Sequence, residues 1–253
     1  MHVRATRETL MAALAAKQLD RTLTSTLPPP EQYDGAAAGA TGMPAWDEGL
    51  GGGFPRGQLS EIVGPVSSGG TSALLRLMAA ATGRGELVGL VDALDRFDPV
   101  SASAAGVALD HLLWVRGSVT AHPGLTRDAV PRALEQALKA LTLILQAGNF
   151  GLVALDLRDA PPEALRRLPF TTWMRVQRML EGQPTVCVLL GREAMARSAA
   201  GLTLRMTQRA PHGRCFAPQT FTGLAVDARV VRARARAQEE RTLSFTTAVA
   251  AHV

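Results

Sequence analysis

The stretch QLSEIVGPVSSGGTSALLRLMAAA, residues 58–81, contains the main indications of the fold. The apolar run Gln58–Val63 predicts a short strand, and Ser72–Ala81 has the composition of a helix. A glycine-rich turn joins the two, which is the context in which a phosphate-binding loop occurs. The pattern of that loop is G-x-x-x-x-G-K-[ST], but here Gly70 takes the place of the lysine.

A phosphate-binding loop acts through backbone N–H groups and a helix N-terminus that point at phosphates. Its lysine adds a cation, and its Ser or Thr hydroxyl holds Mg²⁺. The candidate binding residues are Gly64, Ser67, Ser68, Gly69, Gly70, Thr71 and Ser72, together with Asp156. The favoured interpretation is a vestigial loop with no cofactor and no catalytic residue. Weak nucleotide binding and true hydrolysis with ATP and Mg²⁺ are the alternatives.

Strand-like and helix-like segments alternate on both sides of this turn. Further strands are predicted at Glu86–Val91, Leu112–Val115, Gly151–Leu155 (ending in Asp156) and Thr185–Leu190, and helices at Val100–Ala105, Pro131–Gln146 and Thr171–Leu180. Apolar strands between helices indicate a mostly parallel sheet covered on both faces. From about residue 201 onward strand-like runs such as Leu202–Met206 follow one another, which predicts an antiparallel extension of the sheet.

The N-terminal region has a different composition. Residues 4–23 have helical spacing, and a Pro-, Gly- and Ala-rich segment follows them. We therefore expect a helical arm over residues 1–27, a linker over 28–44 and the α/β core over 45–253. A helix packed on its own core is the alternative for the arm.

Composition narrows the function classes. The chain is 47% hydrophobic, which suits a folded core, and its formal net charge of +5 favours anionic partners. The sequence contains no Cys/His cluster of the kind that forms a zinc site, so we expect no metal. The sequence has no run of about 20 apolar residues, the length needed for a helix to span a membrane. The N-terminus lacks the apolar segment of a signal peptide, so we expect a cytoplasmic protein.

Residues 46–113 resemble the RecA family. The run WDEGLGGGFPRG (46–57), the run EIVGP (61–65) and Ser67-Ser68-Gly69 are similar to consecutive motifs of that family. Val91-Asp92-Ala93, Asp98-Pro99 and Asp110-His111-Leu112-Leu113 continue the match in order and spacing. The resemblance extends over about residues 41–206 and implies a RecA-like fold.

The departures from the family pattern bear on activity. The lysine of the family falls on Gly70, and its catalytic glutamate falls on Leu94 when Asp92 and Asp98-Pro99 are aligned. Asp95 is adjacent to Leu94, but its shorter side chain starts one position away. Because the loss of a cation and of a water-positioning acid each costs orders of magnitude in rate, we expect a pseudo-ATPase.

A shortened and catalytically degenerate RecA-like chain is similar to the ImuA family. That resemblance implies a non-catalytic adaptor in SOS-linked error-prone translesion synthesis, with an ImuB-type polymerase homologue and RecA as partners. Only a short segment separates Thr185–Leu190 from Leu202–Met206, which leaves little room for a long DNA-contacting loop. A nucleotide-gated or weakly active ATPase and a DNA-binding regulator of recombination are the alternatives.

An arginine-rich run near the C-terminus is the candidate surface for DNA or a protein partner. It contains Arg229, Arg232, Arg234 and Arg236. In a strand, positions 232, 234 and 236 would share one face, and Val231, Ala233 and Ala235 would point the other way. Such arginines contact phosphates or an acidic partner. The alternative is a solvated edge strand whose charges prevent unwanted pairing.

Overall fold

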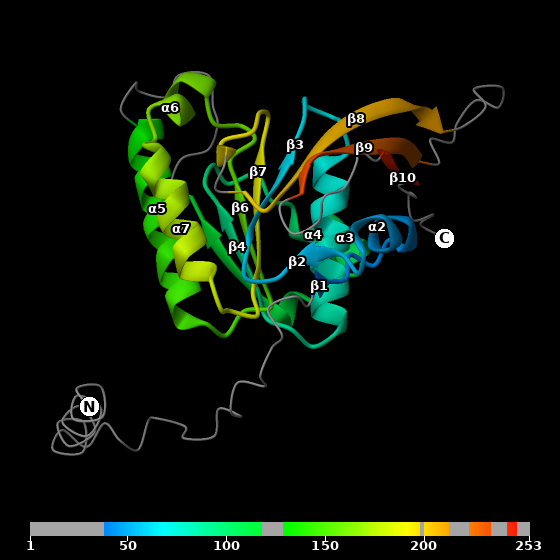
Figure 1. Ribbon diagram of the computed structural model, residues 1–253, viewed down its shortest axis with the longest axis horizontal. Coiled ribbons are helices and arrows are strands. Elements are labelled where there is room, and N and C mark those ends of the chain that lie inside the picture. Colours follow the sequence, from blue (N-terminus) through cyan, green and yellow to red (C-terminus); the bar gives the residue numbers. More distant parts are fainter. Residues whose placement is uncertain (1–37, 118–128, 198–199, 213–222, 234–241, 247–253) are drawn as a thin grey trace, which may run out of the picture. The chain divides into compact units, whose positions relative to one another are not determined.

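The computed structural model describes residues 38–117, 129–197, 200–212, 223–233 and 242–246, drawn in colour in Figure 1. The strands are β1 (Ala38–Gly39), β2 (Phe54–Pro55), β3 (Leu59–Val63), β4 (Val88–Asp92), β5 (Leu112–Arg116), β6 (Leu152–Asp156), β7 (Val186–Gly191), β8 (Leu202–His212), β9 (Gly223–Ala233) and β10 (Thr242–Thr246). The helices are α2 (Pro44–Leu50), α3 (Gly70–Gly83), α4 (Pro99–Ala104), α5 (Ala129–Ala147), α6 (Pro162–Arg166) and α7 (Phe170–Leu180). The predicted arm at 1–27 lies outside the described residues.

Eight of these strands form one sheet in the order β10-β9-β8-β3-β7-β6-β4-β5. The six strands from β8 to β5 are parallel to their neighbours. β9 and β10 then add to β8 in antiparallel fashion. The predicted fold class, a mostly parallel sheet with an antiparallel C-terminal extension, is therefore confirmed.

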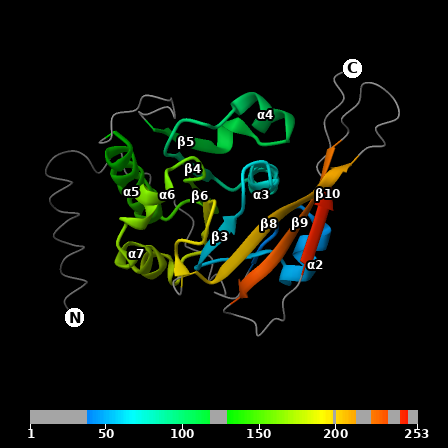
Figure 2. The same cartoon turned by 90° about the horizontal axis from the view of Figure 1, so that it is seen from above.

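Helices cover both faces of the parallel strands, as Figures 1 and 2 show. α5 and α7 pack on one face through buried side chains that recur every three or four residues, which is the pattern of an amphipathic helix. α3 packs on the other face, in a core cluster that also contains residues of α2, β8, β9 and β10. The central strands are buried on both faces; all six residues of β7 are buried.

A short helix that the sequence pattern did not predict closes the edge of this core. α2 has seven residues, begins with Pro44 and ends before Gly51, which adopts a left-handed conformation with φ of 65°. Its Trp46 is fully buried and packs edge-on against Phe245 of β10 at 5.2 Å between ring centroids. The first residue of the motif at residues 46–57, Trp46, thus packs against the antiparallel extension.

A buried arginine ties together the amino-terminal ends of the parallel strands. Arg56 is 5% exposed, and its guanidinium donates to the carbonyl of Pro184 at 2.7 Å and to the carboxylate of Glu86 at 2.6 Å. Arg84 donates to both oxygens of the same carboxylate at 3.1 Å. The approaches to β3, β4 and β7 are therefore held in one hydrogen-bonded cluster.

This cluster predicts a loss of stability in acid. Burial alone raises the pKa of Glu86, but the hydrogen bond from Arg84 and the charge of Arg56 outweigh it, so the pKa lies below its ordinary value of 4.5. A carboxyl with a lowered folded-state pKa stabilises the fold above its unfolded pKa and loses that contribution as the pH falls through the folded value. We expect the free energy of unfolding to decline below pH 4.5.

Urea unfolding over a pH series measures this decline. Glu86→Gln should remove part of the pH dependence, because a neutral amide cannot titrate. Glu181→Gln removes an exposed carboxylate and should leave the slope unchanged. Identical slopes in the wild type and Glu86→Gln would contradict the assignment.

Candidate phosphate-binding site

The glycine-rich turn lies at the carboxyl end of β3 and leads directly into α3. Gly64 follows the strand, and its N–H donates to the carbonyl of Gly191 at 3.2 Å. Gly69 has φ of +91°, a region that L side chains rarely adopt, and it precedes the first residue of α3. The turn therefore has the strand–turn–helix geometry of a phosphate-binding loop, and the N-terminus of a 14-residue helix faces the same space.

The antiparallel extension packs closely behind the turn. A side chain at Gly69 would place its Cβ 2.6 Å from Val226 of β9, and one at Gly64 would come within 2.8 Å of the carbonyl of Met206 in β8. Both glycines are therefore needed for close packing, and Gly69 is needed for its backbone conformation as well. Ser68 is buried between them, whereas Ser67 and Thr71 are exposed.

A pocket of about 300 Å³ opens over the turn. Its wall contains three arginines, Arg96, Arg158 and Arg192, beside the residues 64–71. Asp159 pairs with Arg96 at 2.9 Å and with Arg192 at 3.6 Å. An anion in this pocket would meet both backbone N–H groups and guanidinium groups.

The guanidinium group of Arg158 lies between the carboxylate of Asp156 and the hydroxyl of Thr71. Its Nε donates to Asp156 at 2.9 Å, its Nη2 also pairs with Asp156, and its Nη1 donates to the hydroxyl of Thr71. A Cβ built on Gly70 would lie 4.0 Å from Arg158. Burial lowers the pKa of Arg158, but Asp156, Asp159 and Asp92 raise it overall, so the guanidinium stays charged. One cation thus connects the end of β6 with the start of α3.

Positions 94 and 95, where a water-activating acid was sought in the sequence, do not line this pocket. Leu94 is 2% exposed and belongs to the core cluster that contains α5 and α7. Asp95 is held by Arg116, whose Nε and Nη2 both donate to it at 2.8 Å. Asp92 accepts from the backbone N–H groups of Arg96 and Phe97. No carboxylate at positions 92–95 lines the pocket.

The candidate arginine surface is described only in part. Arg229 and Arg232 lie exposed on β9, whereas Arg234 and Arg236 lie outside the described residues. The expected alternation is interrupted, because the pairing with β8 shifts between Thr203 and Leu204, as at a β-bulge. Val231, expected to face the other way from Arg232, is 50% exposed, and Arg232 beside it is exposed as well. Over residues 225–229, β9 also pairs with β10, so this part is not an edge strand.

The described residues limit two further kinds of site. Across the described ranges, no helix combines the length and the apolar composition needed to cross a membrane. In the same part of the chain, no cluster of three or more His, Cys, Asp or Glu side chains is placed to hold a metal ion.

Comparison with known proteins places this geometry in a family. The family model described as RecA N-terminal domain matches residues 30–160, about half of the chain. The chain belongs to the RecA N-terminal domain family. Three curated relatives with the name Protein RecA agree: those of Chlorobaculum parvum (37% identical over 118 residues), Symbiobacterium thermophilum (38% over 117) and Methylococcus capsulatus (38% over 117).

The match to these RecA proteins is confined to one part of each chain. It covers 46% of this chain and 29–30% of the length of each relative. The range matched by the family model, residues 30–160, includes the glycine turn, α3 and β4, where the sequence motifs were found.

The site does not fit a magnesium nucleotide of the kind that a phosphate-binding loop holds. Such a loop uses its Ser or Thr hydroxyl, supported by an acid at the end of a neighbouring strand, to bind Mg²⁺. Here the corresponding groups, Thr71 and Asp156, are both engaged by the guanidinium of Arg158. A guanidinium cannot coordinate a metal, and its positive charge repels one. The backbone cradle remains, but its metal position is taken.

Sequence reasoning found the turn and Asp156, but it missed the arginines that surround them. The Asp156–Arg158 spacing held a usable signal, because residues two apart after a strand can point to the same side. Nothing in the sequence indicates that Arg158 reaches Thr71, which is 87 residues away.

Proposed function

We propose that this protein is a RecA-like accessory protein without ATPase activity that works by binding other macromolecules. The observation that carries the proposal is the bridge from Arg158 to Thr71 and Asp156. Gly70 removes the mobile lysine that would contact the terminal phosphates, and Arg158 supplies a cation held by its own carboxylate instead. A site with its cation neutralised internally stabilises developing charge on a phosphate poorly.

The finer proposal is an ImuA-like adaptor in SOS-linked error-prone translesion synthesis. Its partners would be an ImuB-type polymerase homologue and RecA, and it would work in the cytoplasm. One feature supports this proposal beside the altered turn: only ten residues (192–201) separate β7 from β8. A recombinase that forms filaments on DNA would need more contact surface than this segment offers.

Steady-state ATP hydrolysis tests the enzymatic part of the proposal. The purified wild-type chain should release phosphate no faster than Asp156→Ala, with and without single-stranded DNA, because neither protein has a lysine at position 70 or an acid at 94. Circular dichroism at the assay temperature should show that both proteins are folded, a necessary control because Asp156→Ala also removes the ion pair with Arg158. Hydrolysis by the wild type that Asp156→Ala abolishes would overturn the pseudo-ATPase proposal.

Affinity capture of the tagged full chain from its own host tests the adaptor part. Polymerase-like subunits or RecA, enriched after DNA damage, would support it. Recovery of nucleic acid without these proteins would favour a second candidate, a DNA-binding regulator. The observation behind that candidate is the cross-strand placement of Arg205 opposite Arg229 on an exposed part of the extension. Its binding should then weaken steeply with salt.

A further inference from the structure

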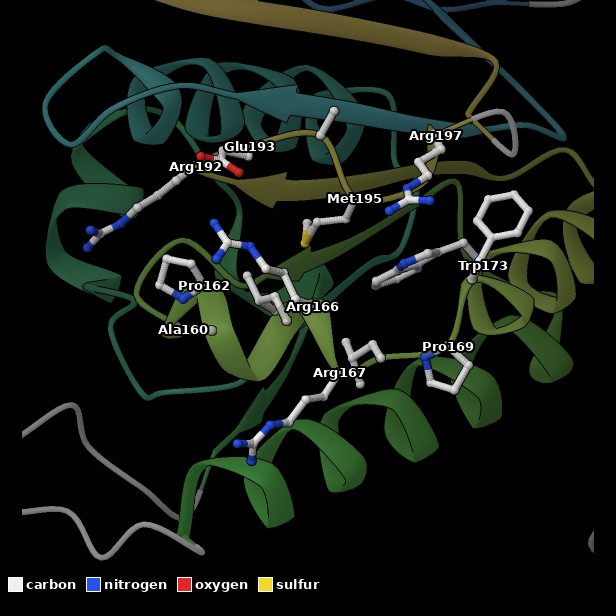
Figure 3. A pocket seen from close by; sticks show the side chains of 14 residues that line it. Ala160, Pro162, Arg166, Arg167, Pro169, Trp173, Arg192, Glu193, Met195 and Arg197 are labelled. Atoms are coloured by element: carbon white, nitrogen blue, oxygen red, sulfur yellow. The ribbon is translucent and has the colours of Figure 1, made fainter.

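A second and larger cavity adjoins the pocket over the phosphate-binding turn, and Arg192 belongs to the lining of both. Its volume is about 440 Å³, within the range of sites that bind small molecules or single side chains of a partner. Figure 3 shows its walls: α6 and the start of α7 on one side, and the segment after β7 on the other. The lining residues relevant here are Arg166, Arg167, Phe170, Trp173, Met195 and Arg197.

Part of the cavity lining is apolar. Trp173 is 2% exposed, and Figure 3 shows its indole directed into the space, with Met195 lying opposite. Phe170, which also lines the cavity, is 37% exposed and leaves aromatic surface open to solvent. Transfer of one leucine- or phenylalanine-sized side chain from water into such a space contributes roughly 1.5–3 kcal/mol.

The rim of the cavity is strongly basic. Arg166, Arg167 and Arg197 are exposed, and within the described ranges none of the three forms an ion pair. Arg192 also lines the cavity, but it is committed to Asp159 and to the carbonyl of Arg158. Glu193 is the one acidic residue of the lining. Three guanidinium groups are therefore available to an acidic ligand.

A buried carboxylate holds one wall of the cavity in place. Glu61 of β3 is fully buried and accepts from the backbone N–H groups of Met195 at 2.6 Å and Ala196 at 2.8 Å. The hydroxyl of Thr203 donates to its other oxygen at 3.1 Å. Because the segment after β7 is fixed before any ligand arrives, less conformational entropy is lost on binding.

We propose that this cavity binds an acidic peptide segment of a protein partner, with one apolar side chain seated against Trp173. The carboxylates of that segment would pair with Arg166 and Arg197 beside the cavity, and those of its flanking residues with Arg167, whose side chain Figure 3 shows directed away from the cavity. Aromatic residues and arginine are also the types enriched at the energetic centres of protein interfaces. A nucleic acid fits less well, because the apolar surface of Trp173 and Met195 has few hydrogen-bonding groups for base edges.

A panel of short acidic peptides tests the proposal on the full chain. The peptides differ only in one central residue, which is each of the 20 amino acids in turn, and binding is followed by fluorescence anisotropy. Peptides with central Leu, Met, Phe or Trp should bind at least about tenfold more tightly than the one with Ala, since each tenfold equals about 1.4 kcal/mol. Failure of every peptide to bind at about 1 mM would overturn the proposal.

Matched variants locate the binding. Arg166→Ala with Arg167→Ala should weaken the best peptide about tenfold or more, and Phe170→Ala should reduce the preference for an apolar centre. Arg175→Ala and Arg178→Ala remove exposed arginines of α7 outside the cavity and should change affinity by less than about twofold. Equal losses of peptide affinity in the Arg166/Arg167 and Arg175/Arg178 variants would contradict binding at this cavity. Tighter binding of an oligothymidylate, lost in the Arg166/Arg167 variant, would assign the cavity to nucleic acid instead.

Discussion

Replacing Arg56 with alanine is expected to destabilise the fold by about 3 kcal/mol, the lower end of the range for breaking a buried ion pair. The substitution leaves the carbonyl of Pro184 without this donor and removes the shorter of the two donors to one oxygen of Glu86, in a region that water reaches poorly. Glu86 keeps its contacts to Arg84, which is why the lower end applies. The midpoint of guanidinium unfolding, at constant slope, measures the change.

Arg84 provides the matched control, because it contacts the same carboxylate from a more exposed position. Its side chain is 34% exposed, against 6% for Arg56. Arg84→Ala should cost about 0.5 kcal/mol, as exposed ion pairs do. Arg56→Lys should fall between the two. A lysine keeps the charge, but its ammonium group cannot replace the planar guanidinium that reaches the carbonyls of Gly151 and Pro184 and the carboxylate of Glu86 together. Equal losses for Arg56→Ala and Arg84→Ala would show that burial does not set the effect.

The central strands could be predicted from the sequence because burial on both faces leaves an unmistakable composition. Gly151–Leu155 reads as an apolar run, and β6 occupies Leu152–Asp156. α2 could not be predicted in the same way. A seven-residue helix shows barely two turns of periodicity, and Trp46 packs against Phe245 far along the chain. Such short elements are set by tertiary contacts more than by local pattern.

The same limit applies to the arginine surface. Strict alternation predicted that Val231 and Arg232 lie on different faces of β9. One bulged residue leaves both side chains exposed. A bulge depends on how β9 pairs with β8, and the sequence of β9 alone does not contain that register. The cavity beside Trp173 could not be predicted from the sequence for a related reason. Its walls come from α6, α7 and the segment after β7, which only the fold brings together.

The phosphate-binding turn yields the other large prediction, a gain of magnesium-dependent nucleotide binding in the double variant Gly70→Lys, Arg158→Ala. In the wild type, ADP affinity should be the same in Mg²⁺ and in EDTA, because Arg158 already engages Thr71 and Asp156. Removing Arg158 frees both groups for a metal, and the new lysine restores a cation for the phosphates. We expect Mg²⁺ to tighten ADP binding by the double variant at least about tenfold, or 1.4 kcal/mol, in isothermal titration calorimetry.

The single variants separate the two causes. Gly70→Lys alone should gain nothing, because its ammonium group would approach Arg158, which lies 4.0 Å from a Cβ at position 70. Arg192→Ala removes a second arginine of the pocket without freeing Thr71, so its ADP binding should stay independent of Mg²⁺. Neither the double variant nor the wild type should hydrolyse ATP, because position 94 remains a buried leucine. Magnesium-dependent binding in the wild type would mean that Arg158 leaves the metal position when nucleotide arrives, and the cation would then be a displaceable gate.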